Sequence, residues 1–220
     1  FPYTTLFRSD SVGEKSRMFI ITAKNVTLKN IRFKNGHASK NYDNTLNSSG
    51  GAIKVNYGAN VIVENCEFIS NTSEEDGGAI ENNGEMVLAR SKLCRNNVQG
   101  WGAAIRNFGN LEIEESQILE NRAKYNGTIY NEGKILIKET SLIENSSEFA
   151  GTIYNKGEME MCYCILSKNN GGYGAAVYNK GDLKISGSTV SNSVTAFSGA
   201  LHYTGQLTIT GSSFAANAAG

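Results

Sequence analysis

The sequence predicts an all-β protein, a right-handed single-stranded parallel β-helix (a solenoid) of about eight coils with roughly 24 residues in each. The first observation behind this prediction is a fixed period, because glycine, asparagine and aromatic residues all recur 24 positions apart. The second is that no segment keeps the apolar period of 3.6 residues expected of an amphipathic helix. The recurring positions are Gly109, Gly133, Gly157, Gly181 and Gly205; Asn107, Asn131, Asn155 and Asn179; and Trp101, Tyr125, Phe149, Tyr173 and Phe197.

Each repeat starts with two small residues and an aliphatic residue, as in Gly127-Thr128-Ile129, and continues with an Asn-x-Gly turn signal. A strand with period-two alternation follows, which places one row of side chains inside and the other outside. A further short strand carries one apolar residue and ends three positions later in asparagine. The inward pairs of the alternating strand are Val61 and Val63, Leu111 and Ile113, Ile135 and Ile137, Met159 and Met161, Leu183 and Ile185, and Leu207 and Ile209. The short strands carry Phe68, Leu93, Ile118, Leu142, Leu166 and Phe214, ahead of Asn71, Asn96, Asn121, Asn145, Asn169 and Asn217.

Turns between these three strands are expected at asparagine and glycine, because both accept the left-handed backbone conformation that a sharp turn demands. The chain has a single proline. Its scarcity agrees with a chain rich in sheet, since ladder positions need their backbone N–H. Three strands and their turns make one coil, and neighbouring coils should lie about 4.8 Å apart.

Composition narrows the classes of partner. Lysine plus arginine and aspartate plus glutamate both number 21, so the formal net charge is zero. We therefore expect no nucleic-acid partner. No apolar run is long enough to span a bilayer, so we expect no membrane insertion by this segment. No motif for a cofactor or a metal is present, and we expect neither.

The cysteines are expected to be free thiols that are buried or half-buried. Cys66 and Cys164 share one column of small residues four coils apart, about 19 Å, which is too far for a disulfide. Cys162 and Cys164 are two positions apart on one strand, and a bridge between them would be strained. A zinc site would need four converging ligands, and both histidines, His37 and His202, lie far from Cys162 and Cys164 in sequence.

The domain organisation is expected to be simple. Residues 1–9 lie outside the repeat and match the translation of a common sequencing adapter, so we interpret them as a sequencing or cloning artefact. Residues 10–220 then form one repeat domain, which we expect to be a fragment of a longer chain. Residues 37–49 interrupt the period and are polar and rich in turn-forming residues, so we expect an insertion loop with no function of its own.

Two aromatic columns are the candidate ligand-binding residues. One consists of Trp101, Tyr125, Phe149, Tyr173 and Phe197, and the other of Tyr130, Tyr154 and Tyr178, continued by His202. By alternation, the second column should face the solvent. Stacking between coils would by itself explain both columns as stabilising features. The alternative is an aromatic strip that binds sugar rings or an apolar patch on a partner.

Catalysis is not expected, and no catalytic residue is assigned. The four aspartates share no column, so clustered acids around a calcium ion are not indicated. The best carboxylate pair for glycoside hydrolysis is Glu112 with Glu114, whose Cα atoms should lie about 6.6 Å apart. Distance alone does not exclude such a pair. However, nothing in the sequence supplies a cleft, and Glu114 is expected to face Lys138 of the next coil in an ion pair.

The tetrapeptide Gly50-Gly51-Ala52-Ile53 recurs as Gly77-Gly78-Ala79-Ile80, and both Phe68-x-x-Asn71 and Phe214-x-x-Asn217 follow. This combination resembles the repeat of polymorphic outer-membrane proteins. The phrase Gly127-Thr-Ile-Tyr-Asn-Glu-Gly133 is similar to a motif of adhesin-like β-helix proteins on microbial cell surfaces. The chain departs from the pattern where Leu93, Ile118 and Leu142 replace the phenylalanine and where Ala103-Ala104 and Ala175-Ala176 replace part of the glycine run.

The repeat and the resemblance together favour a non-enzymatic adhesin-like segment that is secreted or displayed on a cell surface. Such a segment would act as a rigid stalk and as a multivalent contact surface, with weak contacts summed along its columns. The expected partner is a glycan or protein on a host or neighbouring cell. The alternative is a carbohydrate-active β-helix, either a polysaccharide-binding module or a truncated polysaccharide lyase or glycoside hydrolase.

Overall fold

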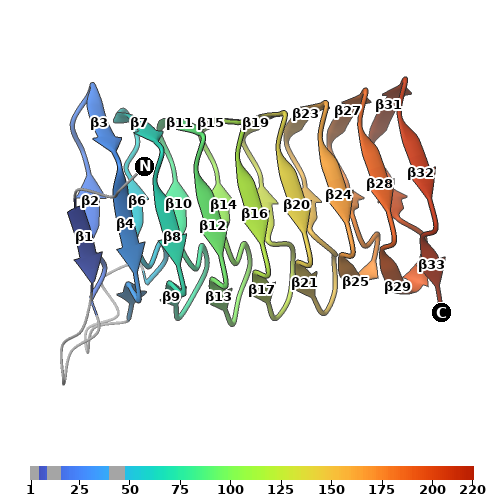
Figure 1. Ribbon diagram of the computed structural model, residues 1–220, viewed down its shortest axis with the longest axis horizontal. Coiled ribbons are helices and arrows are strands. Elements are labelled where there is room, and N and C mark those ends of the chain that lie inside the picture. Colours follow the sequence, from blue (N-terminus) through green and yellow to red (C-terminus); the bar gives the residue numbers. More distant parts are fainter. Residues whose placement is uncertain (1–4, 9–15, 40–47) are drawn as a thin grey trace.

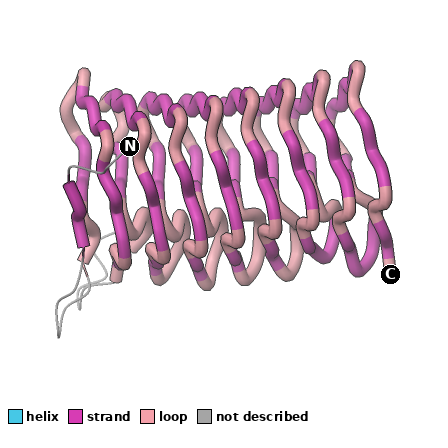
Figure 2. Tube along the Cα trace, viewed as in Figure 1, coloured by secondary structure: helices cyan, strands magenta, loops and turns pink. Residues whose placement is uncertain are grey.

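The computed structural model describes residues 5–8, 16–39 and 48–220. Within these residues the chain is a β-solenoid in which strands of successive coils pair in parallel, so that four sheets run the length of the molecule (Figure 1). The described residues form strands and turns and no helix (Figure 2). Three of the four sheets have eight strands, in agreement with the expected number of coils. The right-handed sense of winding stays a prediction from the sequence.

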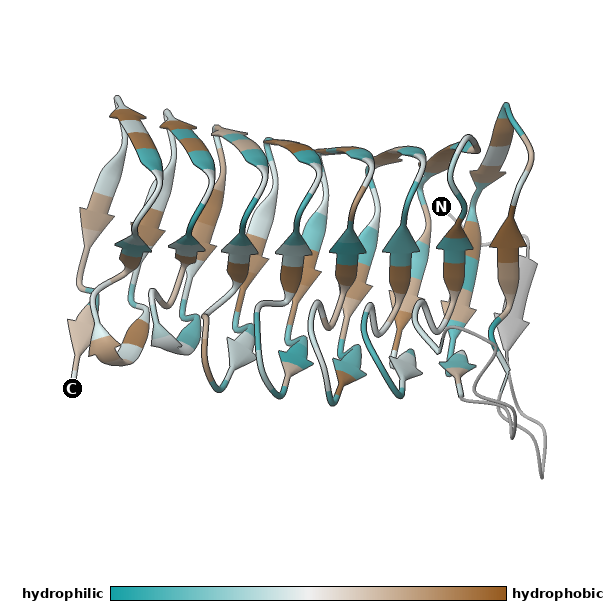
Figure 3. Cartoon of the chain, turned by 180° about the vertical axis from the view of Figure 1, so that it is seen from behind, coloured by the Kyte–Doolittle hydropathy of each residue, from teal (hydrophilic) through white to brown (hydrophobic). Residues whose placement is uncertain are grey.

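Sheet B contains the small-small-aliphatic segments of the repeat. Each strand starts with an aliphatic or aromatic residue, which is buried in the inner strands and half-buried in β2 and β30, and most of the inner strands end in asparagine. Figure 3 shows this change from brown to teal along the strands of one face. The strands, in spatial order, are β2 (Phe19–Ile21), β6 (Ile53–Val55), β10 (Ile80–Asn82), β14 (Ile105–Asn107), β18 (Ile129–Asn131), β22 (Ile153–Asn155), β26 (Val177–Asn179) and β30 (Leu201–Tyr203).

Sheets C and A contain the alternating strand and the short strand. The strands of sheet C are β3 (Val26–Lys29), β7 (Asn60–Glu64), β11 (Glu85–Ala89), β15 (Asn110–Glu114), β19 (Lys134–Lys138), β23 (Glu158–Cys162), β27 (Asp182–Ser186) and β31 (Gln206–Thr210). Those of sheet A are β1 (Thr5–Arg8), β4 (Ile31–Lys34), β8 (Glu67–Ile69), β12 (Lys92–Cys94), β16 (Gln117–Leu119), β20 (Ser141–Ile143), β24 (Ile165–Ser167), β28 (Thr189–Ser191) and β32 (Ser213–Ala215).

Sheet D corrects the expectation of three strands per coil, because each coil has a fourth. Most of its strands are only two residues long, too short to show an alternating pattern, and its side chains are mainly small or polar. That is why the sequence pattern did not reveal it. Its strands are β5 (His37–Ala38), β9 (Thr72–Ser73), β13 (Asn97–Val98), β17 (Arg122–Ala123), β21 (Ser146–Ser147), β25 (Asn170–Tyr173), β29 (Val194–Ser198) and β33 (Ala218–Ala219).

Two segments that the sequence set apart from the repeat contribute strands. Residues Thr5–Arg8, within the expected artefact, form β1 and pair with β4. His37 and Ala38, the first residues of the expected insertion loop, form β5 and pair with β9. The rest of that loop from residue 40 to residue 47 lies outside the described residues.

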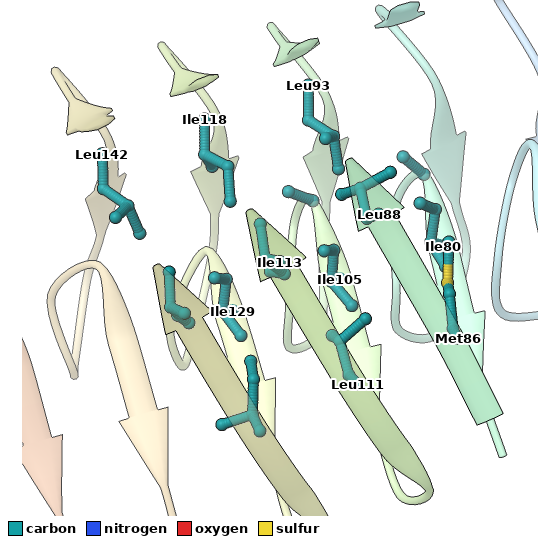
Figure 4. Close-up of a cluster of buried hydrophobic side chains, with 14 of the residues drawn as sticks. Ile80, Met86, Leu88, Leu93, Ile105, Leu111, Ile113, Ile118, Ile129 and Leu142 are labelled. Carbon is teal, nitrogen blue, oxygen red and sulfur yellow. The ribbon is translucent and has the colours of Figure 1, made fainter. Parts of the chain in front are cut away.

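The core is a set of aliphatic rows that follow the coils, as the sequence predicted. Residues at the same position of successive coils are direct strand partners, for example Leu93 with Ile118 and Leu88 with Ile113. Their side chains point into the space enclosed by sheets A, B and C (Figure 4). Burial of apolar surface in these rows is the main source of stability. Within these 220 residues β32 pairs with β28 only, and its Phe214 is 40% exposed.

The corner asparagines correct a second expectation, because they are not themselves the left-handed residues. The residue before each of them takes that conformation, as at Glu120, with φ of 55°, and Glu144, with φ of 57°. The asparagine side chains instead point inward and bond from coil to coil. Asn121 Nδ2 donates to Asn145 Oδ1 at 3.0 Å, and Asn96 Nδ2 donates to Asn121 Oδ1 at 2.9 Å. We call Asn71, Asn96, Asn121, Asn145 and Asn169 the corner asparagine ladder. Their carboxamides satisfy backbone groups that the turn would otherwise leave buried and unbonded.

Two further ladders repeat this solution. At the end of sheet B, Asn107 Nδ2 donates to Asn131 Oδ1 at 2.7 Å, and the same bond recurs along Asn82, Asn107, Asn131, Asn155 and Asn179. In the column of small residues, hydroxyl groups accept bonds from the backbone of the preceding coil, as in Ser91 N to Ser116 Oγ at 3.0 Å. The chain thus fixes its register with buried polar side chains as well as with its apolar rows.

All four cysteines lie in the described part of the chain and are free; Cys66, Cys94 and Cys164 are buried and Cys162 is half-buried. Burial raises the pKa of Cys164 to about 11. A thiol with such a pKa stays protonated and unreactive at neutral pH. No helix in the described residues is long and apolar enough to cross a bilayer.

Candidate functional site

The first aromatic column follows sheet D toward sheet B: Trp101, Tyr125 and Phe149 lie in the segments between the two sheets, whereas Tyr173 and Phe197 lie on the sheet D strands β25 and β29. Three of its side chains are exposed: Tyr125 by 50%, Phe149 by 44% and Phe197 by 67%. Trp101 and Tyr173 are half-buried. Successive rings touch at the C-terminal end, where the Phe149 and Tyr173 centroids lie 5.2 Å apart and the Tyr173 and Phe197 centroids 4.9 Å apart. Exposed apolar rings that repeat along one line form a candidate contact surface.

The second column is where the structure contradicts the sequence prediction. Tyr130, Tyr154 and Tyr178 do project from the outer face of sheet B, but they are only 1%, 5% and 8% exposed. The first column covers them, because Trp101 stacks on Tyr130 at a centroid distance of 4.9 Å and Tyr173 meets Tyr178 edge-on at 6.3 Å. Alternation of side chains correctly gave their direction. It could not show that residues outside the strand would fold over them.

The buried tyrosines form one continuous stack. Centroid distances are 5.3 Å between Tyr130 and Tyr154, 5.1 Å between Tyr154 and Tyr178, and 4.6 Å between Tyr178 and His202. The two Tyr–Tyr pairs are parallel to within 4°. This spacing follows the distance between neighbouring strands. Aromatic pairs contribute about 0.5–1.5 kcal/mol beyond the area that they bury. The stack therefore provides a rigid base beneath the exposed column.

Tyr130, the first tyrosine of the stack, is bonded to two charged side chains. The Tyr130 hydroxyl donates to Glu132 Oε1 at 2.5 Å, and Lys156 Nζ donates to the same oxygen at 2.9 Å. Burial, together with the neighbouring carboxylate, raises the pKa of Tyr130 to about 12. Burial also pushes the pKa of Glu132 upward, but the hydrogen bonds from Tyr130 and Lys156 outweigh it and leave that pKa below its ordinary value. Lys156 Nζ lies 5.4 Å from the Tyr130 ring centroid, which adds a cation–π contact.

Toward the N-terminus, charged residues take the place of tyrosine in this row. Arg106 is the strand partner of Tyr130 and pairs with Asp76 Oδ2 at 3.1 Å. Asp76 also accepts the Trp101 backbone N–H at 2.7 Å, and its burial raises its pKa. A shallow hollow of about 560 Å³ lies between these groups and the exposed ring of Tyr125. The aromatic surface thus ends at a polar border.

Of the carboxylates Glu112 and Glu114, it is Glu112 that forms the ion pair with Lys138, whereas the sequence predicted Glu114. Lys138 is the strand partner of Glu114, as predicted, but its Nζ bonds Glu112 Oε1 at 2.7 Å, diagonally across the strands. Among the described residues, no group of three or more histidine, cysteine, aspartate or glutamate side chains could hold a metal ion.

No family model matches the sequence. No curated protein matches it either. The resemblance to polymorphic outer-membrane protein repeats therefore stays a prediction. Among solved structures, the chain is similar to PfbA, a surface adhesin of Streptococcus pneumoniae, with 10% identity over 98% of this chain and 78% of that one. The TM-score of this match is 0.26.

The surface has one further feature, which the sequence did not predict. A groove of about 670 Å³ runs across the outer face of sheet C, over the first halves of β3, β7, β11, β15 and β19. Ile62 in this groove is 46% exposed, and Val87 and Leu136 are half-buried. The sequence does show an aliphatic residue at this outward-facing position in three of the coils. It does not show how far the neighbouring side chains rise above the sheet, and that determines whether a groove forms.

Proposed function

We propose that this chain is a non-enzymatic segment of a secreted or surface-displayed protein that acts as a rigid stalk and contact surface. The observation that carries the proposal is the exposed column of Tyr125, Phe149 and Phe197 above a buried aromatic stack. Aromatic side chains that are already ordered lose little conformational entropy when a partner binds. They also supply large apolar contact areas, which is why they dominate binding hot spots.

The repeat supports a multivalent mode of contact. The column offers a similar ring at each coil, so a partner with a repeated or extended surface can meet several rings at once. Contacts that are weak one by one then add along the axis. We infer a partner on the surface of a host or neighbouring cell, either a glycan or a protein, and an extracellular place of action for the chain.

Substitution of the exposed rings tests this function. The double variant Phe149→Ala, Phe197→Ala should lose most binding to whole cells or immobilised cell-surface extracts, while its far-UV circular dichroism remains that of the parent. Tyr57→Ala is the matched control, because Tyr57 is 94% exposed and lies outside the column. Equal binding by all three proteins would contradict the proposed contact surface.

The only tryptophan gives a second readout. Trp101 borders the column and stacks on Tyr130, so its fluorescence should shift or be quenched when a ligand covers the neighbouring rings. A saturable change with soluble glycans that is abolished by Tyr125→Ala would favour the carbohydrate-binding alternative at this surface. An unchanged spectrum together with retained cell binding would favour a protein partner.

A further inference from the structure

The groove on sheet C has two unlike walls. In β7, β11, β15 and β19, one wall is the row of first residues and the other is the row of third residues. Both rows face outward, because they are two positions apart on an alternating strand. The first row is polar, with Asn60, Glu85, Asn110 and Lys134. The third row is mainly aliphatic, with Ile62, Val87, Glu112 and Leu136. The second residues, such as Met86, are buried, so the strand backbone forms the floor.

We propose that this groove binds a linear, uncharged polysaccharide that lies along the solenoid axis. A pyranose ring has an apolar face of C–H groups and an edge of hydroxyl groups. The aliphatic wall can pack against the C–H face while the amide and carboxylate groups opposite bond the hydroxyls. The volume of about 670 Å³ falls within the usual range of ligand sites.

The period of the groove favours a sugar chain over a peptide. Five strands at the usual spacing give the groove a length of about 19 Å. A β-1,4-linked pyranose chain is extended and advances per sugar by nearly the distance between two coils, so each sugar lies over one coil. Alternate sugars, which share one orientation, then lie two coils apart. Side chains on one side of an extended peptide recur every 6.6–6.8 Å or so, which is out of step with the coils.

The charges of the groove favour an uncharged chain over an acidic one. Glu112 is paired with Lys138 at 2.7 Å, and Lys134 with Glu158 at 3.4 Å. Glu85 is exposed and has no ion pair among the described residues. The groove therefore keeps one carboxylate that can accept hydrogen bonds from hydroxyl groups and that repels uronate sugars.

This site is separate from the aromatic column, which lies beside sheet B. The inference does not depend on the proposed contact function, and each can fail alone. Loss of cell binding in the Phe149→Ala, Phe197→Ala variant concerns the column, whereas the substitutions below concern only the groove.

The test is isothermal titration calorimetry of the full chain with each of four oligosaccharides: cellohexaose, xylohexaose, mannohexaose and hexa-N-acetylchitohexaose. At least one of them should bind saturably. Ile62→Lys should weaken that binding by about tenfold or more, because it replaces an apolar contact in the aliphatic wall with a charged side chain. Ile62 is 46% exposed, so the substitution should leave the fold intact. Glu85→Ala should weaken the binding as well. Glu160→Lys is the matched control. Glu160 occupies the third position of β23, lies outside the groove and is exposed, so this variant should bind the oligosaccharide with the affinity of the parent.

Several results would overturn the inference. These are the absence of binding by all four oligosaccharides, tighter binding of oligogalacturonate than of any uncharged chain, or affinity that Ile62→Lys leaves intact while Phe149→Ala abolishes it. Competition by extended peptides at the same positions would also overturn it, since it would show a groove built for polypeptide. Far-UV circular dichroism of each variant excludes a loss of fold as the cause.

Discussion

At the scale of single residues, the molecule depends on polar side chains placed where an apolar core would be expected. Asn121 is fully buried, and its carboxamide accepts two bonds from Asn96 while donating to Asn145 and to the backbone of Leu93. A carboxamide has both donors and acceptors, so the same Asn–Asn hydrogen bond can repeat from each coil to the next. A carboxylate in the same position would repel its neighbours in the coils on both sides.

Asn121→Ala should therefore destabilise the chain strongly. It removes the acceptor of two buried N–H groups of Asn96, and each orphaned donor costs about 1–3 kcal/mol. The urea midpoint measures this loss. Asn110→Ala serves as a control, because Asn110 is exposed and a substitution there should change stability by no more than about 0.5 kcal/mol. Equal midpoints for the two variants would show that the ladder contributes nothing.

The bonds between Tyr130, Glu132 and Lys156 predict a dependence of stability on pH. The pKa of Glu132 is lower in the folded chain than its ordinary value near 4.5. Its contribution is therefore present above that value and is lost as the pH falls through the lower folded pKa. Glu132→Gln should reduce the urea midpoint at pH 7, and the difference from the parent should shrink as the pH falls below the ordinary value of the Glu132 pKa. A difference that stays constant with pH would contradict this assignment.

At the scale of the element, the corners and the glycines of the coil have different physical causes. Non-glycine residues such as Glu115 and Glu120 hold a left-handed backbone at the two corners flanking sheet A. The glycines at the period of 24 residues do not. A Cβ atom at Gly133 would lie 2.2 Å from the carbonyl oxygen of Gly109 in the preceding coil. Glycine is required there because two backbones approach closely.

Gly133→Ala should thus destabilise the chain by more than about 1 kcal/mol, since backbone atoms must move to accept the methyl group. Gly199→Ala is the comparison, because the nearest atom to its Cβ would be 3.9 Å away and its φ is not in the left-handed region. Thermal melting of both variants decides the matter. The close-approach explanation fails if Gly133→Ala melts at the temperature of the parent.

The same elements show what sequence reasoning could reach. The alternating strand of sheet C and the inward residue of sheet A were predictable, because a period of two is visible in a few residues. The two-residue strands of sheet D carry too little pattern. The inward asparagines were taken for turn residues, since asparagine suits both roles and only the backbone angles distinguish them. The burial of Tyr130 depends on Trp101 from an adjoining segment, and the groove depends on five coils together.

At the scale of the whole molecule, stability should be distributed unevenly along the axis. In a protein of these 220 residues, a coil in the middle is paired on both sides, whereas the coil of β30 to β33 is paired on one side and leaves Ile209 39% and Phe214 40% exposed. In a solenoid, stability is close to a sum over coils and the interfaces between them. The ends should therefore open first.

Hydrogen exchange followed by mass spectrometry measures this gradient. Amides of β18 and β22 should exchange more slowly than those of β30 and β31 by about an order of magnitude or more. Uniform exchange along the chain would mean that the solenoid opens as one cooperative unit instead.

The ladders of identical bonds have a consequence for how such a chain can change over generations. Because Asn107, Asn131 and Asn155 are each bonded to a copy of themselves, a coil fits beside any other coil that keeps the same few residues. Duplication or loss of 24 codons would lengthen or shorten the molecule by one coil and leave the cross-section as it was. Recombination between the repeats can therefore change the length of the molecule one coil at a time, while the surface of each remaining coil stays the same.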